Sequence, residues 1–207
     1  MNQNYFQLPE EKQNKLLNAG YKLFSIYPYK KASMAAVTEE AGISKSLLFY
    51  YFKNKKEFYL FLFKKAVEFM NKDKTKSYSK ERIDLFDAVN LEVERRMRLL
   101  KNYPFLLRFT ARVYYETNNE VASEISIMKN QMTQFGKKEW LNLISSEPFE
   151  DENDIPILIN IILHVAEGCM RGIEDLDPEK LNEILPEFQK MMDSLKKRYY
   201  KKFLEEV

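Results

Sequence analysis

The stretch EEAGISKSLLFYYFKNKKEF, residues 39–58, has the pattern of two short helices joined by a tight turn. Gly42 can adopt the left-handed backbone conformation that ends a helix, which a residue with a Cβ resists. Ser44 follows where an N-cap oxygen would accept hydrogen bonds from the first free N–H groups of a new helix. Leu48 and Phe52 are four residues apart, so they share one face and are predicted to pack inward.

The remaining arc of the second helix is predicted to face solvent, with the basic, hydroxyl and aromatic side chains of Lys45, Ser46, Phe49 and Tyr50. A short helix held at a fixed angle by a glycine turn, with such an outer face, suits the major groove of DNA. The alternative interpretation is a plain helix pair with an aromatic core and no nucleic-acid role.

These residues resemble the recognition region of TetR-type transcriptional regulators, which reads roughly A-G-V-S-K-G-x-L-Y-Y-H-F-x-x-K-E-x-L. The resemblance runs from Ala41 to Phe58 and covers about the first 60 residues. Three positions depart from the family pattern, because Phe49 replaces a tyrosine, Tyr51 a histidine and Ser46 a glycine. We expect the docking mode to be kept and the base preference to differ.

The resemblance implies an all-α fold, with a three-helix DNA-binding domain containing a helix-turn-helix at residues 1–53. A helical effector-binding and dimerisation domain would follow at residues 54–207. It also implies a transcriptional regulator, usually a repressor, that binds a palindromic double-stranded DNA operator as a homodimer and is released by a small molecule. The residues expected at the DNA are Lys30, Lys31, Ser33, Ser44, Lys45, Ser46, Leu47, Phe49, Tyr50, Tyr51 and Lys55.

Charge is distributed unevenly, although the net formal charge of the 207 residues is only +2. Residues 1–65 carry 11 Lys or Arg and 5 Asp or Glu, a net charge of +6. Residues 66–207 carry 22 and 26, a net charge of −4. Positive charge therefore gathers with the helix-turn-helix, as binding to a polyanion requires, although solvated helix faces would give a similar count.

Apolar spacing predicts helices along the whole chain, and no convincing alternation predicts a sheet. The polar residues 72–80 are predicted to be a linker. The β-branched run at 155–162 also fits a buried strand, but its continuation to residue 175 without a turn signal favours a helix. The helices predicted after the linker span residues 81–101, 104–116, 120–145, 154–175 and 177–204.

The second domain is expected to bind a small, largely apolar effector, in an apolar pocket with a few polar groups. More than half of its many aromatic and methionine residues are expected to be plain core. The candidate effector contacts are Tyr103, Arg108, Phe109, Arg112, Trp140, His164 and Glu167. Asn160, His164, Glu167 and Arg171 form one polar stripe, which faces either the pocket or the dimer interface.

The last two predicted helices have broad apolar faces, and in TetR-like proteins the last two helices of each subunit form a four-helix dimer bundle. Gly168 and Gly172 are four residues apart and would permit a close helix contact. The alternative is that both glycines are tolerated irregularities.

No catalytic, cofactor or metal site is expected. The chain has one histidine and one cysteine, Cys169, which excludes an internal disulfide and a cluster of several Cys and His ligands. No P-loop, G-x-S-x-G or dinucleotide fingerprint is present. His164 and Glu167 could form an acid–base pair, but no nucleophile or phosphate loop accompanies them. We therefore expect a protein that is not an enzyme.

No signal peptide is visible, and the apolar run at 155–166 is too short to span a bilayer, so a cytoplasmic location without membrane contact is expected. The competing hypothesis is a helical protein that binds small molecules or a membrane surface without sequence-specific DNA binding. Its support is the same basic and aromatic N-terminal region, which would also suit anionic lipid.

Overall fold

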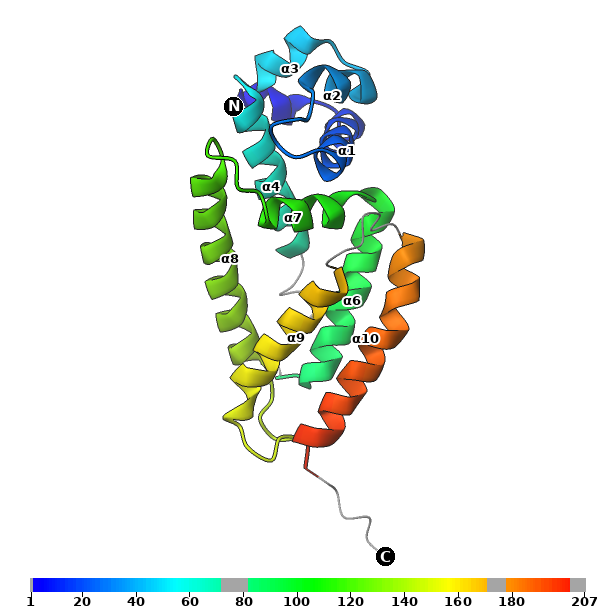
Figure 1. The fold of residues 1–207 in the computed structure, drawn as a ribbon, viewed down its shortest axis with the longest axis vertical. Helices are drawn as coiled ribbons and strands as arrows, with labels where there is room; N and C mark the ends of the chain where they lie inside the picture. Colours follow the sequence, from blue (N-terminus) through cyan, green and yellow to red (C-terminus); the bar gives the residue numbers. More distant parts are fainter. Residues whose placement is uncertain (1, 72–81, 171–177, 202–207) are drawn as a thin grey trace, which may run out of the picture. The chain divides into compact units, whose positions relative to one another are not determined.

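The computed structural model describes residues 2–71, 82–170 and 178–201. Within these ranges β-pairing is limited to two isolated bridges, Ile83 with Ile144 and Phe149 with Tyr200, so the predicted all-α fold is confirmed. The elements are the 3₁₀-helix η1 (Gln3–Gln7) and the α-helices α1 (Glu10–Ile26), α2 (Met34–Ala41), α3 (Lys45–Tyr51), α4 (Lys55–Asn71), α6 (Leu85–Asn102), α7 (Leu106–Tyr114), α8 (Ala122–Leu143), α9 (Asp154–Met170) and α10 (Pro178–Tyr199) (Figure 1).

The chain divides into two compact units. The first consists of Met1–Lys72 and Arg98–Met132, and the second of Asp73–Met97 and Thr133–Val207. Helices α6 and α8 therefore contribute residues to both units. Helices α4 and α7 belong to the same compact unit as the helix-turn-helix, so the boundary between the compact units differs from the domain boundary predicted after residue 53. That domain boundary concerns function and stays a prediction.

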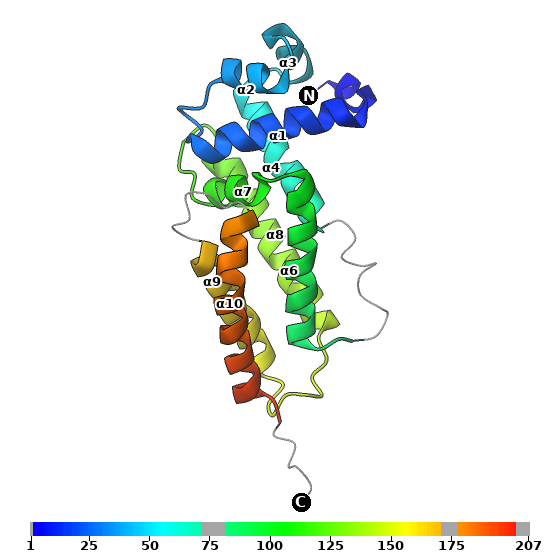
Figure 2. The ribbon, with the colours of Figure 1, turned by 90° about the vertical axis from the view of Figure 1, so that its right-hand side faces the viewer.

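Helix α1 is the centre of the first unit, where it contacts α2, α4 and α7 (Figure 2). The inner face of α1 is buried at Leu16, Leu17, Gly20 and Phe24. A Cβ added at Gly20 would lie 2.5 Å from Cδ1 of Leu62. The absence of a side chain at Gly20 is therefore what allows α1 and α4 to pack this closely.

Aromatic rings fill much of the space between α1, α4 and α7. The ring of Phe24 lies 4.8 Å from that of Tyr59, and Phe109 lies 5.2 Å from Tyr21 and 5.6 Å from Tyr59. All four residues are buried. Such edge-on and tilted ring pairs add to the apolar burial that stabilises the unit.

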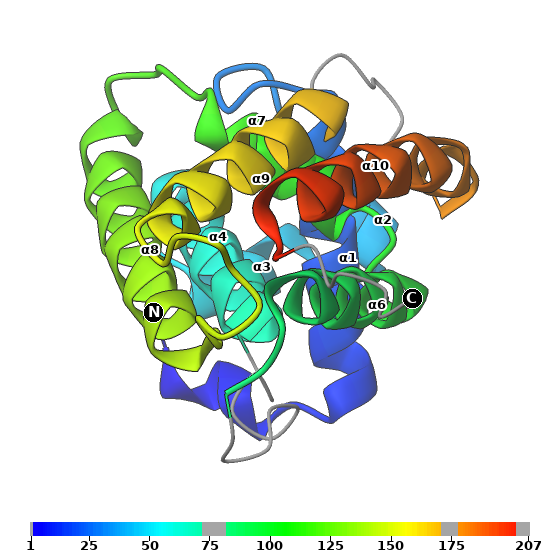
Figure 3. The same cartoon turned by 90° about the horizontal axis from the view of Figure 1, so that it is seen from below.

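The second unit has a separate apolar core. Its α9 and α10 lie side by side and run in opposite directions (Figure 3). The β-branched run at 155–162 is helical, so the strand interpretation is excluded. The buried residues of this core are Leu85, Phe86, Ala88, Val89, Ile144, Phe149, Ile155, Leu158, Ile159, Ile162, Phe188 and Met192.

Helix α10 ends at Tyr199, earlier than the predicted end at residue 204, which itself lies outside the described residues. The chain leaves the helix to pair with the segment before α9. The Glu150 N–H donates to the Tyr199 carbonyl at 3.2 Å, and the Lys201 N–H donates to the Pro148 carbonyl at 2.9 Å. These bonds replace the helical ones that a longer α10 would have made.

Candidate nucleic-acid interface

The turn between α2 and α3 has the geometry that the sequence predicts. Gly42 has φ 66° and ψ 35°, the left-handed conformation, while the Ile43 N–H donates to the Thr38 carbonyl at 3.0 Å. A Cβ at Gly42 would meet nothing within 4 Å, so glycine is needed here for its backbone angles rather than for space. Ser44 Oγ accepts from the Leu47 N–H at 3.1 Å and caps α3.

Helix α3 has one buried and one exposed side. Leu48 and the residue that follows the helix, Phe52, are fully buried, as predicted. The opposite side is exposed to solvent, and Tyr50 is its most open aromatic residue at 53% exposure. The exposed residues of α3 are Lys45, Ser46, Leu47, Phe49 and Tyr50. This arc is basic at its start and aromatic at its end.

Tyr51 does not lie on that exposed arc, although it was expected among the residues at the DNA. Its side chain is only 6% exposed, and its ring lies 6.0 Å from that of Tyr5 in η1. The reason is its spacing, because Tyr51 is three residues from Leu48 and shares its face. The short helix η1, which the sequence analysis missed, covers this face.

Three further predicted residues are exposed around the start of α2. Lys30 and Lys31 lie in the turn after α1, and Ser33 caps α2 by accepting from the Ala36 N–H at 3.4 Å. A serine hydroxyl that accepts a backbone N–H still has its own hydrogen to donate. Ser33 and Ser44 can therefore cap their helices and also donate to a phosphate oxygen.

Asn54 caps α4 and accepts from the Glu57 N–H at 2.8 Å. The Glu57 carboxylate reaches back to the N–H of Lys53 at 3.0 Å, one residue before the position that a standard capping box uses. The start of α4 is thus fixed beside the end of α3. This places Lys55 in the first turn of a well-anchored helix.

Lys55 itself is partly buried. Its ammonium donates to the Lys30 carbonyl at 3.3 Å and lies 4.9 Å from the centre of the Tyr29 ring. Burial lowers the pKa of Lys55, while the carboxylates of Glu120 and Glu116 act in the opposite direction. Lys55 therefore joins α4 to the connection between α1 and α2.

Tyr29, which is buried, links the same connection to the segment around the start of α8. Its N–H donates to Glu116 Oε2 and its hydroxyl to Glu120 Oε2, both at 2.9 Å. Nearby, Lys56 in α4 pairs with Glu124 in α8 at 2.5 Å. We call Tyr29, Lys56, Glu116, Glu120 and Glu124 the acidic clasp. It ties the connection between α1 and α2, and the start of α4, to one end of α8 within the first unit.

The residues predicted to contact an effector fall into the two units. In the first unit Tyr103 stacks on Phe69 with ring centres 4.5 Å apart, and its hydroxyl donates to Asn14 Oδ1 at 2.7 Å. Arg112 Nη1 donates to the Ser25 carbonyl at 3.2 Å. Phe109 is part of the aromatic core and Arg108 is half-buried. Tyr103, Phe109 and Arg112 thus all make structural contacts.

In the second unit Trp140 packs against the core, Glu167 is half-buried and His164 is exposed. His164 Nδ1 lies 2.7 Å from the Asn160 carbonyl, which can only accept, so this nitrogen is the donor. A shallow hollow of about 500 Å³ on α9 is lined by Ile157, Asn160, Ile161, His164 and Val165. The fourth residue of the predicted polar stripe, Arg171, lies outside the described residues.

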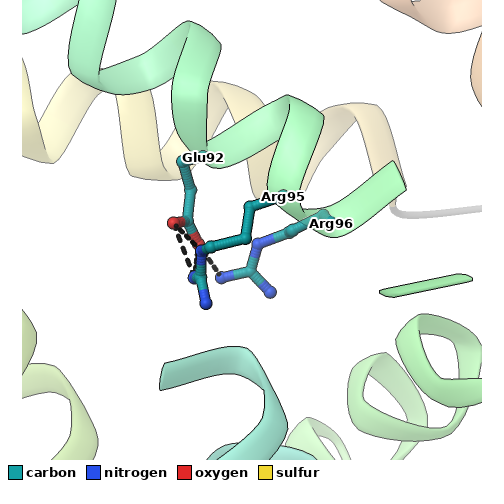
Figure 4. Close-up of polar contacts among 3 residues, drawn as sticks. All are labelled: Glu92, Arg95 and Arg96. Carbon is teal, nitrogen blue, oxygen red and sulfur yellow. Dashed lines mark hydrogen bonds and ion pairs between the residues drawn. The ribbon is translucent and has the colours of Figure 1, made fainter. Parts of the chain in front are cut away.

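A charged cluster on α6 was not singled out in the sequence (Figure 4). Glu92 receives two bonds from Arg95 Nη2, at 2.6 and 2.7 Å, and one from Arg95 Nε at 3.0 Å. Arg96 Nη2 approaches the same carboxylate at 2.7 Å. The side chains of Glu92 and Arg95 are only 13% and 12% exposed. Charges this far from water need such partners, because removing them from water is costly.

In the part of the chain that the structure describes, no helix combines the length and apolarity that crossing a membrane needs. No three His, Cys, Asp or Glu side chains among those residues are grouped so that they could hold a metal ion.

Residues 16–61 match the family model described as bacterial regulatory proteins, tetR family. The N-terminal region belongs to the TetR family. The fold of the whole chain agrees, because a TetR family transcriptional regulator from Chloroflexus aurantiacus J-10-fl has a TM-score of 0.65. Sequence identity with that protein is 18%, and the match covers 97% of this chain and 99% of the other.

Two other solved structures give the same TetR-family architecture. MexZ, a repressor responsible for antibiotic resistance in Pseudomonas aeruginosa, has a TM-score of 0.60 at 16% identity, covering 90% of this chain and 96% of its own. A tetR family regulator from Shewanella sp. PV-4 has a TM-score of 0.59 at 17% identity, covering 94% and 100%. No curated protein matches the sequence. The chain thus has the fold of a DNA-binding transcriptional regulator.

Proposed function

We propose that this protein is a ligand-responsive transcriptional repressor that binds a palindromic operator as a homodimer and releases it when a small molecule binds. The observation that carries the proposal is the exposed arc of α3, which begins with Lys45 and ends with Phe49 and Tyr50. It follows a left-handed glycine turn within a TetR-family region. Such a helix can enter a major groove, where side chains read base edges.

Within this interface we assign different roles to different residues. Phe49 has no hydrogen-bonding group, so apolar contact with a thymine methyl is its expected role. Lys45 offers a charge to a phosphate or a guanine, and Lys30 and Lys31 offer charges to the backbone. Lys55 would have to leave the Tyr29 ring to reach a phosphate, so its contact is coupled to the connection between α1 and α2.

A homodimer is supported by apolar side chains that α9 and α10 leave in solvent. Ile157 is 52% exposed, and Leu163 and Met191 are also exposed. Ile157, His164 and Gly168 lie on one side of α9, because their spacings of seven and four residues return to the same face. We assign the hollow beside His164 to this dimer surface rather than to the effector pocket.

For the effector, Trp140 and Glu167 in the second unit stay candidate contacts, and the cluster of Arg95 and Arg96 with Glu92 in the same unit is a further candidate. Arg108, in the first unit, stays a separate candidate. A regulator needs an effector that favours one of two conformations, because a ligand with equal affinity for both shifts nothing. The acidic clasp offers a route to the DNA, since it joins α8 to α4 and to the connection before α2. A shift of α8 would therefore act directly on the DNA-binding helices.

Retention of genomic DNA fragments in the presence of excess unrelated duplex tests the proposal. The wild-type chain should retain a distinct subset of fragments, and Lys45→Ala should weaken binding and lower the salt slope by about one unit. Lys138→Ala, which removes an exposed charge from α8, is the matched control and should change neither. Equal retention of all fragments, together with binding to vesicles of anionic phospholipid, would favour the competing hypothesis of a surface-binding protein.

A further inference from the structure

The short helix η1 lies against the end of α3, ahead of the region that the family model matches. That region begins at residue 16, whereas η1 spans Gln3–Gln7. The Asn2 N–H donates to the Tyr51 carbonyl at 2.8 Å. Tyr5 is fully buried, with its ring 5.4 Å from Phe52 and 5.0 Å from Phe61. The chain therefore fixes η1 directly on the recognition helix.

One residue of η1 reaches the exposed arc of α3. Asn4 Nδ2 donates a hydrogen bond to the hydroxyl oxygen of Tyr50. Asn4 is itself held in place, because its N–H donates at 3.0 Å to Oδ1 of Asn2, the N-cap of η1. The contact joins residues 46 positions apart and lies at the surface, so it contributes little to the buried core.

The direction of this bond determines what the Tyr50 hydroxyl can do. A phenol oxygen accepts hydrogen bonds and has one hydrogen to donate. Because the amide of Asn4 supplies a donor to the oxygen, the hydroxyl hydrogen is left to point outward. About half to two-thirds of the hydrogen bonds between proteins and DNA go to phosphate and sugar oxygens, from tyrosine hydroxyls among other groups. The contact between Asn4 and Tyr50 thus leaves the Tyr50 hydroxyl oriented to donate its hydrogen to an acceptor outside the protein.

We propose that η1 is part of the DNA interface and that Asn4 is a positioning residue, which orients the Tyr50 hydroxyl to donate to a DNA phosphate. The inference rests on the proposed DNA-binding function. It concerns Tyr50 in particular because Phe49 has no hydroxyl and Tyr51 is turned into the core. Asn4 acts through Tyr50, and its effect on DNA affinity depends on the tyrosine hydroxyl.

A double-mutant cycle tests this dependence, with dissociation constants measured by fluorescence anisotropy on DNA selected by the wild-type chain. Asn4→Ala and Tyr50→Phe should each weaken binding about tenfold, as expected for hydrogen bonds to charged groups. The double variant should be no weaker than the weaker of the two single variants. Thermal unfolding of each variant, followed by circular dichroism, should give a midpoint close to that of the wild type.

Two further variants make the test specific. Asn4→Asp places a carboxylate where the amide was, which would capture the tyrosine hydrogen and repel phosphate. Asn4→Asp should weaken DNA binding more than Asn4→Ala does. In a chain that already carries Tyr50→Phe, Asn4→Asp should weaken binding by a smaller factor than it does in the wild-type chain. Gln7→Ala removes another exposed amide of η1 and should bind like the wild type.

The outcomes separate this inference from the function on which it rests. Losses of affinity that multiply in the double variant, or wild-type affinity in Asn4→Ala, would overturn the role of Asn4 while leaving DNA binding intact. A wild-type chain that selects no DNA sequence at all would overturn both.

Discussion

At the scale of single residues, the helix-turn-helix depends on one backbone conformation and one cluster of buried rings. Gly42 supplies the positive φ that turns the chain from α2 into α3. Leu48 and Phe52 then hold α3 to the core and leave its other side free. The exposed arc is thus positioned by a glycine turn and by two buried residues.

The first prediction concerns Gly42. Replacing Gly42 by alanine should lower the free energy of unfolding by about 1–2 kcal/mol, because the left-handed conformation brings Cβ close to the following carbonyl oxygen. The surrounding space is open, so no steric contact with other residues contributes. Urea denaturation measures the difference.

Gly42→Asn is the matched control for the same position, because asparagine adopts the left-handed conformation more readily than alanine. It should therefore cost less stability than Gly42→Ala. If Gly42→Ala were as stable as the wild type, the left-handed backbone at this position would not be what requires glycine.

Most of the exposed arc could be predicted from the sequence, because helical spacing alone separates Lys45, Ser46, Phe49 and Tyr50 from Leu48. Tyr51 could not be placed in this way. Its burial depends on η1, and residues 2–8 contain too few apolar positions to show a helical period. The ring of Tyr5 contacts that of Tyr51, and Tyr5 also contacts Phe61, so the contact joins positions far apart in the chain.

At the scale of elements, α4 and the start of α8 hold the DNA-binding helices through the acidic clasp. Tyr29 is its centre, because it bonds both Glu116 and Glu120. Burial of the phenol, and after it the carboxylate of Glu120, raises the pKa of Tyr29, so the hydroxyl stays protonated and donates throughout the physiological range. The links of the acidic clasp are polar. The start of α8 is therefore joined to α4 and to the connection between α1 and α2 partly by a few specific hydrogen bonds and an ion pair.

The second prediction tests whether these bonds act together. Tyr29→Phe and Glu120→Ala should each reduce stability, and a double-mutant cycle should give a coupling energy of about 1 kcal/mol, as for a single hydrogen bond. Urea denaturation of the four proteins supplies the values. Glu150→Ala, at an exposed position in the second unit, should show no coupling with Tyr29→Phe. A coupling of zero between Tyr29 and Glu120 would mean that the bond contributes nothing to holding α8.

Sequence periodicity located the helices well but could not reveal the clasp. Glu116, Glu120 and Glu124 fall at four-residue spacing and resemble an ordinary solvated face in the sequence. Their partners, Tyr29 and Lys56, lie at least 68 positions away, and only the folded chain brings them together. For the same reason, helical spacing in the sequence could not predict that residues 98–132 pack into one compact unit with the N-terminal helices.

At the scale of the whole molecule, the proposed function requires two copies of the chain. A dimer of helix-turn-helix proteins places its recognition helices about 34–36 Å apart, so that both enter the major groove on one side of the DNA. Exposed apolar residues on α9 and α10 are the surface that we assign to this contact. Burying them would remove apolar area from water and stabilise the assembly.

The third prediction is that the wild-type chain sediments as a dimer at micromolar concentration. Ile157→Glu should shift it to monomer, because the charge would be buried without a partner. Leu141→Glu is the matched control, since Leu141 is also an exposed apolar residue but lies on α8. A monomeric wild type, or equal disruption by the two substitutions, would contradict the assigned surface.

The most direct test of the central claim is selection of bound DNA from a random pool by the wild-type chain. We predict an enriched inverted repeat, whose two half-sites have centres one helical turn of DNA apart, about 34–36 Å, or a multiple of it. The repeat would report DNA reading and dimer symmetry in one measurement. A pool that stays random after repeated rounds, or an enriched site without any inverted repeat, would contradict the account.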